Sequence, residues 1–372
     1  MLIGIDASRA VAAERTGTEN YTLYLIRALV ARGGERRFRL YLQRQPSEGL
    51  LPRAERVTWR VIPFPRLWTH VRLAWETLRH PADVLFVPAH VLPLVHPRRC
   101  VVTVHDLGFR HYPQAHTRWS RWYLEWSTRR NARVARRVIA DSQATRADLM
   151  ACYGTPADKI VVAYPAGGEG MAPVRDADAL AAVRARYGTG ERYFLYVGTL
   201  QPRKNIPALV RAYAALVAAG TVAADVNLVV AGKQGWLSAE IAATVAELGL
   251  QQRVVLTGYV PQADLPALLS GALAYVLPSW YEGFGLPVLE AMACETPVIC
   301  SNVSSLPEVA GDAALLVPPG DVPALSAALR RIYSEPALRE SLVARGRARA
   351  RAFTWERCAD QVLAVLDQVA EE

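Results

Sequence analysis

The stretch Ser279-Trp-Tyr-Glu-Gly-Phe-Gly-Leu-Pro-Val-Leu-Glu290 joins a predicted strand to a predicted helix. The apolar run at residues 272–277 has the length and composition of a buried strand. Gly283 and Gly285 then allow a tight loop, and Pro287 suits the first turn of a helix. A strand, a glycine loop and a helix in this order form the repeating unit of a parallel sheet. The stretch therefore favours an α/β fold.

Two carboxylates stand in this stretch, Glu282 in the predicted loop and Glu290 in the first helical turn. A glycine loop that leads into a helix binds anions, because backbone N–H groups and the positive helix end point the same way. Carboxylates would repel an anion, so we expect both to face a neutral part of the ligand, such as sugar hydroxyls. The combination suggests a sugar phosphate or a nucleotide sugar. For Glu290 the alternative is a simple complement to the helix dipole.

The length and composition fit a large globular protein. The chain has 372 residues, of which 52% are apolar, and this is enough for two domains. We find no run of about eighteen apolar residues, and residues 1–6 resemble a strand rather than a signal peptide. The five cysteines (100, 152, 294, 300 and 358) form no CxxC pair. These features predict a cytoplasmic protein with reduced thiols.

Short apolar runs alternate with helix-like segments along the whole chain, as in parallel α/β proteins. Helices are expected, for example, at residues 206–219 and 323–333. Six strands in each half predict two doubly wound domains of similar size, with a boundary in the glycine-rich segment between residues 165 and 191. The expected strands are residues 2–6, 39–42, 58–62, 84–87, 101–105, 138–141, 193–197, 227–231, 254–257, 272–277, 297–300 and 314–317.

The net charge of +9 is unevenly distributed. Residues 1–172 hold 26 Lys and Arg against 14 Asp and Glu, a net charge of +12, whereas residues 173–372 have a net charge of −3. The first half is therefore expected to face an anionic partner. The alternative is an arginine-rich surface without a specific role.

Residues 117–137 interleave Trp119, Trp122 and Trp126 with many arginines. This spacing places the three tryptophans on one face of a helix. A basic helix of this kind can lie on an anionic membrane surface. The alternative is a helix whose tryptophans face the core and whose arginines face solvent. Such helices also bind nucleic acid, but no nucleic-acid-binding motif accompanies this one, so we expect no nucleic acid partner.

Polar clusters follow several predicted strands, where open parallel sheets bind their ligands. These positions also carry glycines that allow the backbone to approach a ligand closely. If two domains face each other across these edges, the clusters share one cleft. The candidates at the strand ends are His105, Asp106, Gly198, Arg203, Lys204, Lys233, Gly232, Gly258 and Glu282.

Two of these clusters suggest specific chemistry. Arg203 and Lys204 are adjacent cations on a strand-to-helix loop, and a guanidinium fork with an ammonium group suits a diphosphate. The alternative is a solvated basic turn. His105 could donate to a sugar oxygen or act as an acid or base, with Asp106 beside it. The alternative for this pair is a helix cap by Asp106 and a packed His105.

Several weaker features carry less chemistry. Gly17, in the loop after the first strand, is a candidate substrate contact, although a plain turn is an equal alternative. Asp176-Ala-Asp178 matches an Asp-x-Asp metal pattern but lies in the predicted linker, so we interpret it as solvated acids. Five histidines (90, 96, 105, 111 and 116) fall close together without a zinc spacing, and no P-loop occurs. We therefore expect no metal site.

The motifs together resemble those of the retaining glycosyltransferases of family 4, which have the GT-B architecture. Tyr193-Phe-Leu-Tyr-Val-Gly-Thr-Leu-Gln-Pro-Arg-Lys-Asn-Ile206 resembles the donor-diphosphate motif of that family. The stretch from Ser279 to Ala293 resembles its E-x7-E motif. Thr296-Pro-Val-Ile-Cys-Ser301 and residues 306–319 continue the pattern, and Thr103-Val-His-Asp-Leu107 and Ala140-Asp-Ser-Gln-Ala-Thr145 fit it in the first half. The resemblance covers nearly the whole chain.

The resemblance implies a role for each matching residue. Arg203 and Lys204 would hold the donor diphosphate, Glu282 the donor sugar and Glu290 the nucleotide ribose. Tyr259 would lie near the base, and His105 beside the donor sugar and the reaction centre. The backbone N–H groups of the glycine loop would face the sugar or the phosphate, and these belong to Gly283, Phe284, Gly285 and Leu286.

The resemblance also implies the domain arrangement. Residues 1–170 would form an acceptor-binding Rossmann-like domain, and residues 188–352 a nucleotide-sugar-binding one. The C-terminal helix, at about residues 355–372, would cross back onto the first domain. Two departures concern Gly17, which stands alone where the family often has two or more glycines, and Tyr164-Pro-Ala-Gly-Gly-Glu169, which replaces the usual turn before the linker.

The predicted reaction is transfer of a hexose, mannose or a similar sugar, from a nucleotide-diphosphate sugar to an acceptor hydroxyl with retention of configuration. We expect no metal or other cofactor, because Arg203, Lys204 and the loop amides can stabilise the leaving diphosphate. The acceptor would be a saccharide or a lipid-linked saccharide, used in cell-surface polysaccharide or glycolipid synthesis at the inner face of the membrane. The alternatives are a nucleotide-sugar epimerase or phosphorylase, and a non-catalytic nucleotide-sugar-binding subunit.

Overall fold

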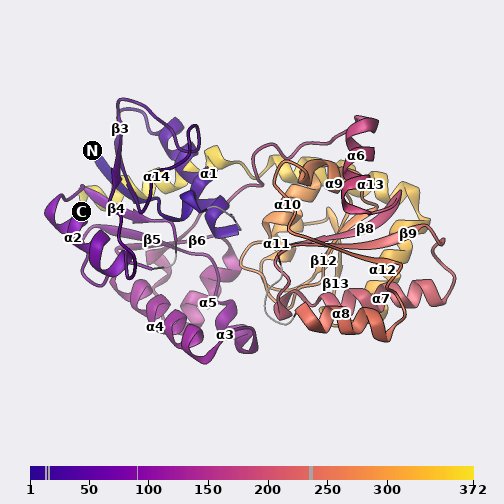
Figure 1. Cartoon of the computed structure of the whole chain (residues 1–372). Coiled ribbons are helices and arrows are strands. Elements are labelled where there is room, and N and C mark those ends of the chain that lie inside the picture. The colour runs from indigo at the N-terminus through magenta and orange to yellow at the C-terminus, as the bar shows by residue number, and fades with distance from the viewer. Residues whose placement is uncertain (13–14, 16, 90, 234–237) are drawn as a thin grey trace. The chain divides into compact units, whose positions relative to one another are not determined.

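The computed structural model describes residues 1–12, 15, 17–89, 91–233 and 238–372. The chain divides into two compact units (Figure 1). Unit 1 contains residues 1–110, 117–166 and 353–372, and unit 2 contains residues 111–116 and 167–352. Each unit is built on one parallel β-sheet.

Unit 1 has a seven-stranded sheet with the order β3-β2-β1-β4-β5-β6-β7. The order reverses between β1 and β4, as in a doubly wound fold. The strands are β1 (Leu2–Asp6), β2 (Arg37–Leu42), β3 (Val57–Val61), β4 (Val84–Val87), β5 (Cys100–Val104), β6 (Arg137–Ala140) and β7 (Ile160–Val162). The helices are α1 (Gly17–Arg32), α2 (Ala74–Arg79), α3 (Gly108–His111), α4 (Arg118–Val134), α5 (Gln143–Tyr153) and α14 (Trp355–Glu371), and the short π-helix η2 (Thr69–Leu73) leads into α2.

Unit 2 has a six-stranded sheet with the order β10-β9-β8-β11-β12-β13, which reverses between β8 and β11. The strands are β8 (Arg192–Val197), β9 (Val226–Ala231), β10 (Val254–Gly258), β11 (Ala274–Leu277), β12 (Val298–Ser301) and β13 (Ala314–Val317). The helices are α6 (Ala177–Tyr187), α7 (Ile206–Ala218), α8 (Ser238–Glu247), α9 (Leu265–Ser270), α10 (Leu286–Ala293), α11 (Leu306–Ala310), α12 (Val322–Ser334) and α13 (Pro336–Arg351), with a 3-10 turn η5 (Pro202–Lys204) before α7.

The fold class is confirmed as α/β with two Rossmann-like sheets. Every predicted strand is present within two residues of its predicted ends. The prediction missed β7, a three-residue strand at the edge of the first sheet. So short a run carries no period from which a strand can be recognised.

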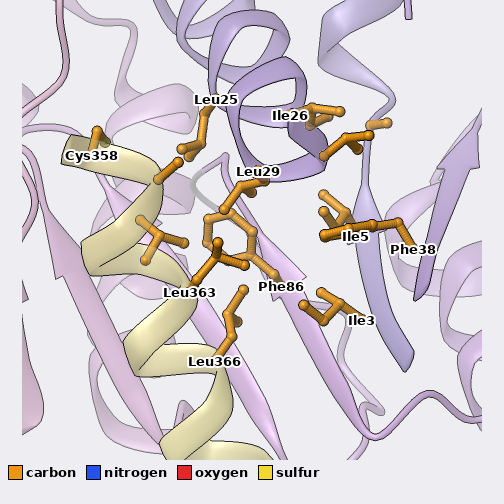
Figure 2. Close-up of a cluster of buried hydrophobic side chains, with 14 of the residues drawn as sticks. Ile3, Ile5, Leu25, Ile26, Leu29, Phe38, Phe86, Cys358, Leu363 and Leu366 are labelled. Carbon is orange, nitrogen blue, oxygen red and sulfur yellow. The ribbon is translucent and has the colours of Figure 1, made fainter. Parts of the chain in front are cut away.

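The C-terminal helix completes the core of unit 1 (Figure 2). Leu363 and Leu366 of α14 are buried with Leu25 and Leu29 of α1. Two arginines of unit 1 bind aspartates of the same helix, and Arg36 contacts Asp367 at 2.5 Å. Because α14 packs on α1 and the sheet, the final residues of the chain are part of this domain's folding unit.

Helix α4 has an unusual orientation. Its buried side chains are small or polar, namely Ser127, Thr128, Asn131 and Ala132. Its tryptophans are exposed, and Trp119 is 82% accessible. The alternative in which the tryptophans of residues 117–137 face the core is therefore wrong.

Several other predicted features have a clear local structure. Asp176 is the N-cap of α6 and accepts hydrogen bonds from the backbone N–H groups of Asp178 and Ala179. All five cysteines are unpaired thiols. His90, one of the five clustered histidines, lies outside the described residues. No helix in the described part of the chain is long and apolar enough to cross a bilayer.

Candidate active site

The candidate site of unit 2 lies where its strand order reverses. β8 ends at Val197 and leads through η5 into α7, and β11 ends at Leu277 and leads through the glycine loop into α10. β8 and β11 are neighbours in the sheet, so the two following loops emerge side by side. In open parallel sheets this is the place where ligands bind. The fold thus brings together Arg203, Lys204 and Glu282, which are about eighty residues apart in the chain.

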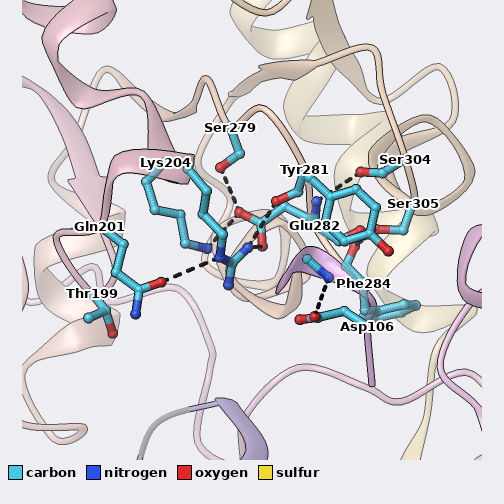
Figure 3. Close-up of polar contacts among 12 residues, drawn as sticks. Asp106, Thr199, Gln201, Lys204, Ser279, Tyr281, Glu282, Phe284, Ser304 and Ser305 are labelled. Carbon is cyan, nitrogen blue, oxygen red and sulfur yellow. Dashed lines mark hydrogen bonds and ion pairs between the residues drawn. The ribbon is translucent and has the colours of Figure 1, made fainter. Parts of the chain in front are cut away.

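Glu282 is the centre of this cluster (Figure 3). Lys204 Nζ donates to its Oε1 at 2.6 Å, and Arg203 donates to its Oε2 at 3.0 Å. The hydroxyl of Ser279 also donates to Oε1 at 2.6 Å. Arg203 makes a further hydrogen bond to the carbonyl of Tyr281 at 2.9 Å. The carboxylate therefore holds the guanidinium and the ammonium group in fixed positions.

Electrostatics keeps Glu282 ionised. Burial alone would raise the pKa of this carboxyl, but the charges of Lys204 and Arg203, with hydrogen bonds from Lys204 and Ser279, lower the pKa to about 2. The three groups together carry a net charge of +1. From its sequence context Glu282 had no evident structural role, and the structure supplies one as the anchor of both cations.

The glycine loop is held by serines of a neighbouring loop. Ser305 donates to the carbonyl oxygens of Glu282 and Phe284, and the N–H of Glu282 donates to Ser304. Gly285, just before α10, has φ of +105°, and a Cβ there would lie 2.8 Å from Leu306. Only glycine fits this position. Gly283, Phe284 and Gly285 are buried, and Leu286 is the first residue of α10.

Two more glycines close the ends of β8 and β9. Gly198 has φ of +155° and Gly232 has φ of +152°. A Cβ on Gly232 would lie 1.8 Å from the carbonyl oxygen of Gly198, so no other residue fits there without moving the backbone. Gly198 therefore shapes the start of the loop that carries Arg203. Lys233 and Tyr259 follow β9 and β10 and are exposed, Tyr259 by 48%.

Glu290 lies apart from the cations, on α10. Its Oε1 accepts a hydrogen bond from the backbone N–H of Gly168 at 3.2 Å. Burial raises the pKa of Glu290 to about 7, against an ordinary value of 4.5, and the Gly168 hydrogen bond only partly opposes this. The two glutamates thus have opposite electrostatic surroundings, although only seven residues separate them.

Gln262 was not predicted from the sequence, because no motif or charge marks it. Among the residues that the structure describes, its buried Nε2 is one of the side-chain atoms without a hydrogen-bond partner. A Cβ placed on Gly168 would lie 2.8 Å from this nitrogen and 3.0 Å from Glu290 Oε1. The amide of Gln262 and the carboxylate of Glu290 therefore both pack closely against Gly168, where no larger residue fits without displacing them.

In unit 1, His105 is held by the protein itself. Its Nδ1 lies 2.7 Å from Asp141 Oδ2, and its Nε2 lies 3.0 Å from the carbonyl oxygen of Pro88. Burial lowers the pKa of His105, but the Asp141 carboxylate outweighs burial and raises it overall. Asp141 is a further site residue that the sequence analysis did not single out. Both ring nitrogens of His105 have protein partners, so a hydrogen bond from His105 to a substrate would require one of these two contacts to break.

The neighbours of His105 have structural roles as well. Asp106 accepts a hydrogen bond from the N–H of Gly108 at the start of α3, which agrees with the capping alternative. The hydroxyl of Thr145 donates to the carbonyl of His105 at 3.1 Å. Gly17 begins α1, and a Cβ there would meet no atom within 4 Å, so this position does not require glycine for space.

Comparisons with known proteins agree with this architecture. A family model described as Glycosyltransferase Family 4 matches residues 15–166, and one described as Glycosyl transferases group 1 matches residues 183–349. O-antigen chain mannosyltransferase B of Escherichia coli is 36% identical over 293 residues, which cover 78% of this chain and 76% of that protein. O-antigen chain mannosyltransferase RfbU of Salmonella typhimurium is 30% identical over 250 residues, 66% of this chain and 64% of its own length.

Solved structures show the same fold. Sucrose-phosphate synthase from Thermosynechococcus elongatus superposes with a TM-score of 0.75 at 24% identity, over 99% of this chain and 98% of that one. HepE of Anabaena, solved with UDP and glucose, superposes with a TM-score of 0.76 at 18% identity, over 99% of both chains.

Two Rossmann-like sheets in one chain, together with these family and sequence matches, identify a GT-B glycosyltransferase. The predicted family resemblance is confirmed, and the protein is an enzyme that transfers sugars. The chain belongs to glycosyltransferase family 4.

Proposed function

We propose that this enzyme transfers mannose from a nucleotide-diphosphate mannose to a hydroxyl of a growing saccharide, with retention of configuration. The choice of mannose rests on the names of its relatives, two of which are O-antigen chain mannosyltransferases. The observation that carries the donor class is the cluster of Arg203, Lys204 and Glu282 at the switch point of unit 2. Fixed cations beside a glycine loop suit a diphosphate.

Arg203 and Lys204 would bind the donor diphosphate and stabilise the charge that develops on it as the sugar leaves. Such stabilisation works best when the donors are already in place, and Glu282 holds both cations in position before any ligand arrives. Glu282 would also contact the transferred sugar. The proton of the acceptor hydroxyl would pass to a phosphate oxygen of the donor, with attack on the face from which the diphosphate leaves. No metal cofactor is required for these steps.

Glu290 and Gln262 would bind the ribose of the donor. A ribose hydroxyl both donates and accepts hydrogen bonds. The Glu290 carboxylate can accept from such hydroxyls, and the Gln262 amide can donate to their oxygens. The absence of a Cβ at Gly168 lets both of these polar groups approach the same stretch of backbone.

The acceptor would be a lipid-linked saccharide, and the enzyme would work on cell-surface polysaccharide at the inner face of the membrane. The net charge of +12 over residues 1–172 supports a partner that is anionic, such as a lipid diphosphate or the membrane surface. His105 would lie beside the donor sugar, with Asp141 fixing its ring.

The test is a thermal-shift screen against GDP-, UDP- and TDP-sugars, followed by product analysis with a lipid-linked acceptor in EDTA. We expect stabilisation by a mannose donor and an α-linked product from an α-linked donor. Turnover of the donor without an acceptor would favour an epimerase or phosphorylase, and binding without turnover would favour a non-catalytic subunit. An absolute requirement for Mg²⁺ would contradict the proposed metal-free mechanism.

A further inference from the structure

Helix α4 of unit 1 exposes its largest aromatic side chains to solvent. Amphipathic helices usually bury their large apolar side chains and expose their polar ones. Here Ser127, Thr128 and Asn131 are buried, whereas Trp119 and Trp122 are 82% and 60% exposed. The buried side is held by specific contacts, since the Asn131 side chain accepts a hydrogen bond from the N–H of Leu92. The orientation of the helix is therefore built into the fold.

The exposed aromatic side chains form one continuous group along α4. Trp122 and Trp126 stack with ring centroids 6.3 Å apart. Trp119 contacts Trp122 edge to face, and Tyr123 contacts Trp126. Monomeric proteins rarely leave such aromatic surface in water, so a group of this size indicates an interaction site.

A second apolar stripe adjoins it. Val71 of η2 and Trp75 and Leu78 of α2 are all exposed, and so is Leu67 just before η2. His70 of η2 joins this segment to α4 through a 2.9 Å hydrogen bond to the Tyr123 hydroxyl. We call the surface made by these two stripes the tryptophan face. Its side chains are Leu67, Val71, Trp75, Leu78, Trp119, Trp122, Tyr123 and Trp126.

The two segments of this face are strongly basic. Residues 66–79 and 117–134 contain eight arginines and two acids. The two acids are already neutralised, because Glu76 pairs with Arg60 at 2.7 Å and Glu125 with Arg110 at 2.7 Å. Arg118 and Arg121 lie beside the exposed tryptophans and are themselves exposed. Unit 1 therefore combines tryptophans, whose rings favour the boundary between lipid and water, with positive charge.

We propose that the tryptophan face docks on an anionic lipid bilayer, with α4 lying in the plane of the headgroups. Tryptophan prefers the membrane–water interface, and arginines attract anionic lipids, so both halves of the composition point to the same partner. The inference rests on the membrane partner in the proposed function and identifies the residues that make the contact. Docking by unit 1 would hold the enzyme at the surface that carries a lipid-linked acceptor.

The experiment is flotation of the full chain with two kinds of vesicle. One kind is neutral phosphatidylcholine alone, and in the other about one lipid in three is anionic phosphatidylglycerol. We expect the protein to bind the anionic vesicles at low salt and not to bind the neutral vesicles. High salt should weaken the binding, because screening shortens the reach of the arginines. Wild-type protein that stays unbound with anionic vesicles at low salt would overturn the proposal.

Matched variants locate the contact. Arg118→Gln with Arg121→Gln should lower the partition coefficient by about fivefold for each arginine. The control pair Arg330→Gln and Arg351→Gln removes the same charge from exposed sites on α12 and α13 and should leave binding unchanged. Equal losses in the two pairs would mean that net charge alone drives binding, which would contradict the proposal.

Trp119→Ser with Trp122→Ser should abolish vesicle binding and keep the melting temperature, since both side chains are exposed. Sedimentation of the wild type without lipid tests for a second copy of the chain as the occupant. A dimer that the Trp119→Ser/Trp122→Ser variant dissociates would overturn the proposal in favour of self-association. Binding of the nucleotide sugar is a property of unit 2 and should be unchanged in all these variants. If the wild type fails to bind a nucleotide sugar, that result counts against the proposed function and not against the docking face.

Discussion

Replacing Glu290 by glutamine separates two effects of one half-buried carboxyl, on stability and on ligand binding. In the folded protein the pKa of Glu290 is about 7, whereas an ordinary glutamate has 4.5. A shift of one pKa unit corresponds to about 1.4 kcal/mol, so a pKa of about 7 in place of 4.5 means that ionised Glu290 lowers the free energy of unfolding by about 3.5 kcal/mol at most. Because the side chain is partly accessible, we expect between about 1.5 and about 3 kcal/mol.

The sign follows from proton binding. The folded state holds the Glu290 proton more tightly than the unfolded state does, so stability is greatest below pH 4.5 and falls as pH rises towards 7. Glu290→Gln has no proton to lose. The variant should match the wild type near pH 4.5 and exceed it in stability above pH 7, because its neutral amide can still accept the Gly168 hydrogen bond.

The assay is urea unfolding of both proteins between pH 4.5 and 8.5, with tryptophan fluorescence as the probe of unfolding. A difference in unfolding free energy that stays constant across this range would refute the reasoning. Binding gives the second readout: Glu290→Gln should weaken affinity for the nucleotide sugar by about 10- to 100-fold, the loss expected for hydrogen bonds to a charged group. A nucleotide sugar is a better ligand for this test than a free nucleotide. Both ends of its diphosphate are esterified, so only strongly acidic groups remain and the ligand does not titrate in the pH range of the assay.

Other sites give further predictions. Gln262→Ala should weaken nucleotide-sugar binding by about fivefold, and a donor with 2′-deoxyribose should remove this difference. The control is Gln251→Ala at an exposed position, and equal effects of the two variants would exclude a ribose contact by Gln262. Asp141→Asn should lower the pKa of His105 relative to the wild type, because burial is then no longer outweighed by the Asp141 carboxylate. NMR titration of the His105 ring measures this, and an unchanged pKa would contradict the assigned pair. Leu366→Ala, at a fully buried position of α14, should lower the free energy of unfolding by about 2 to 5 kcal/mol, and a loss below 1 kcal/mol in urea unfolding would show that α14 is not part of the folding unit of unit 1.

Apart from β7, the strands were predictable because each is short and rich in apolar residues. The glycines and Pro287 of the loop before α10 marked a strand-to-helix connection, and the structure contains it. Adjacent cations and two glutamates indicated a diphosphate-sugar ligand without any knowledge of their contacts. Periodicity and residue type are local properties of the sequence, so they can be recognised without knowledge of tertiary contacts.

What the sequence did not reveal depends on contacts between distant residues. The ion pairs of Glu282 with Arg203 and Lys204 span 79 and 78 residues, and no local pattern encodes them. The tryptophan stripe of α4 has the period of a core-facing helix, and only the packing of Asn131 and its neighbours shows that the opposite side is buried. Gln262 is one of several glutamines, and its role follows only from its place beside Gly168 and Glu290.

The central claim is that Arg203 and Lys204 bind and stabilise the diphosphate of the sugar donor. The most direct test is the steady-state kcat of Arg203→Ala and Lys204→Ala with a nucleotide-diphosphate mannose and a lipid-linked acceptor, with the exposed Arg211→Ala on α7 as a control. Each site variant should lose about two to three decades of turnover, the scale of removing one donor that stabilises developing negative charge, while Arg211→Ala stays near the wild type. Near-normal turnover in both Arg203→Ala and Lys204→Ala would contradict the assignment.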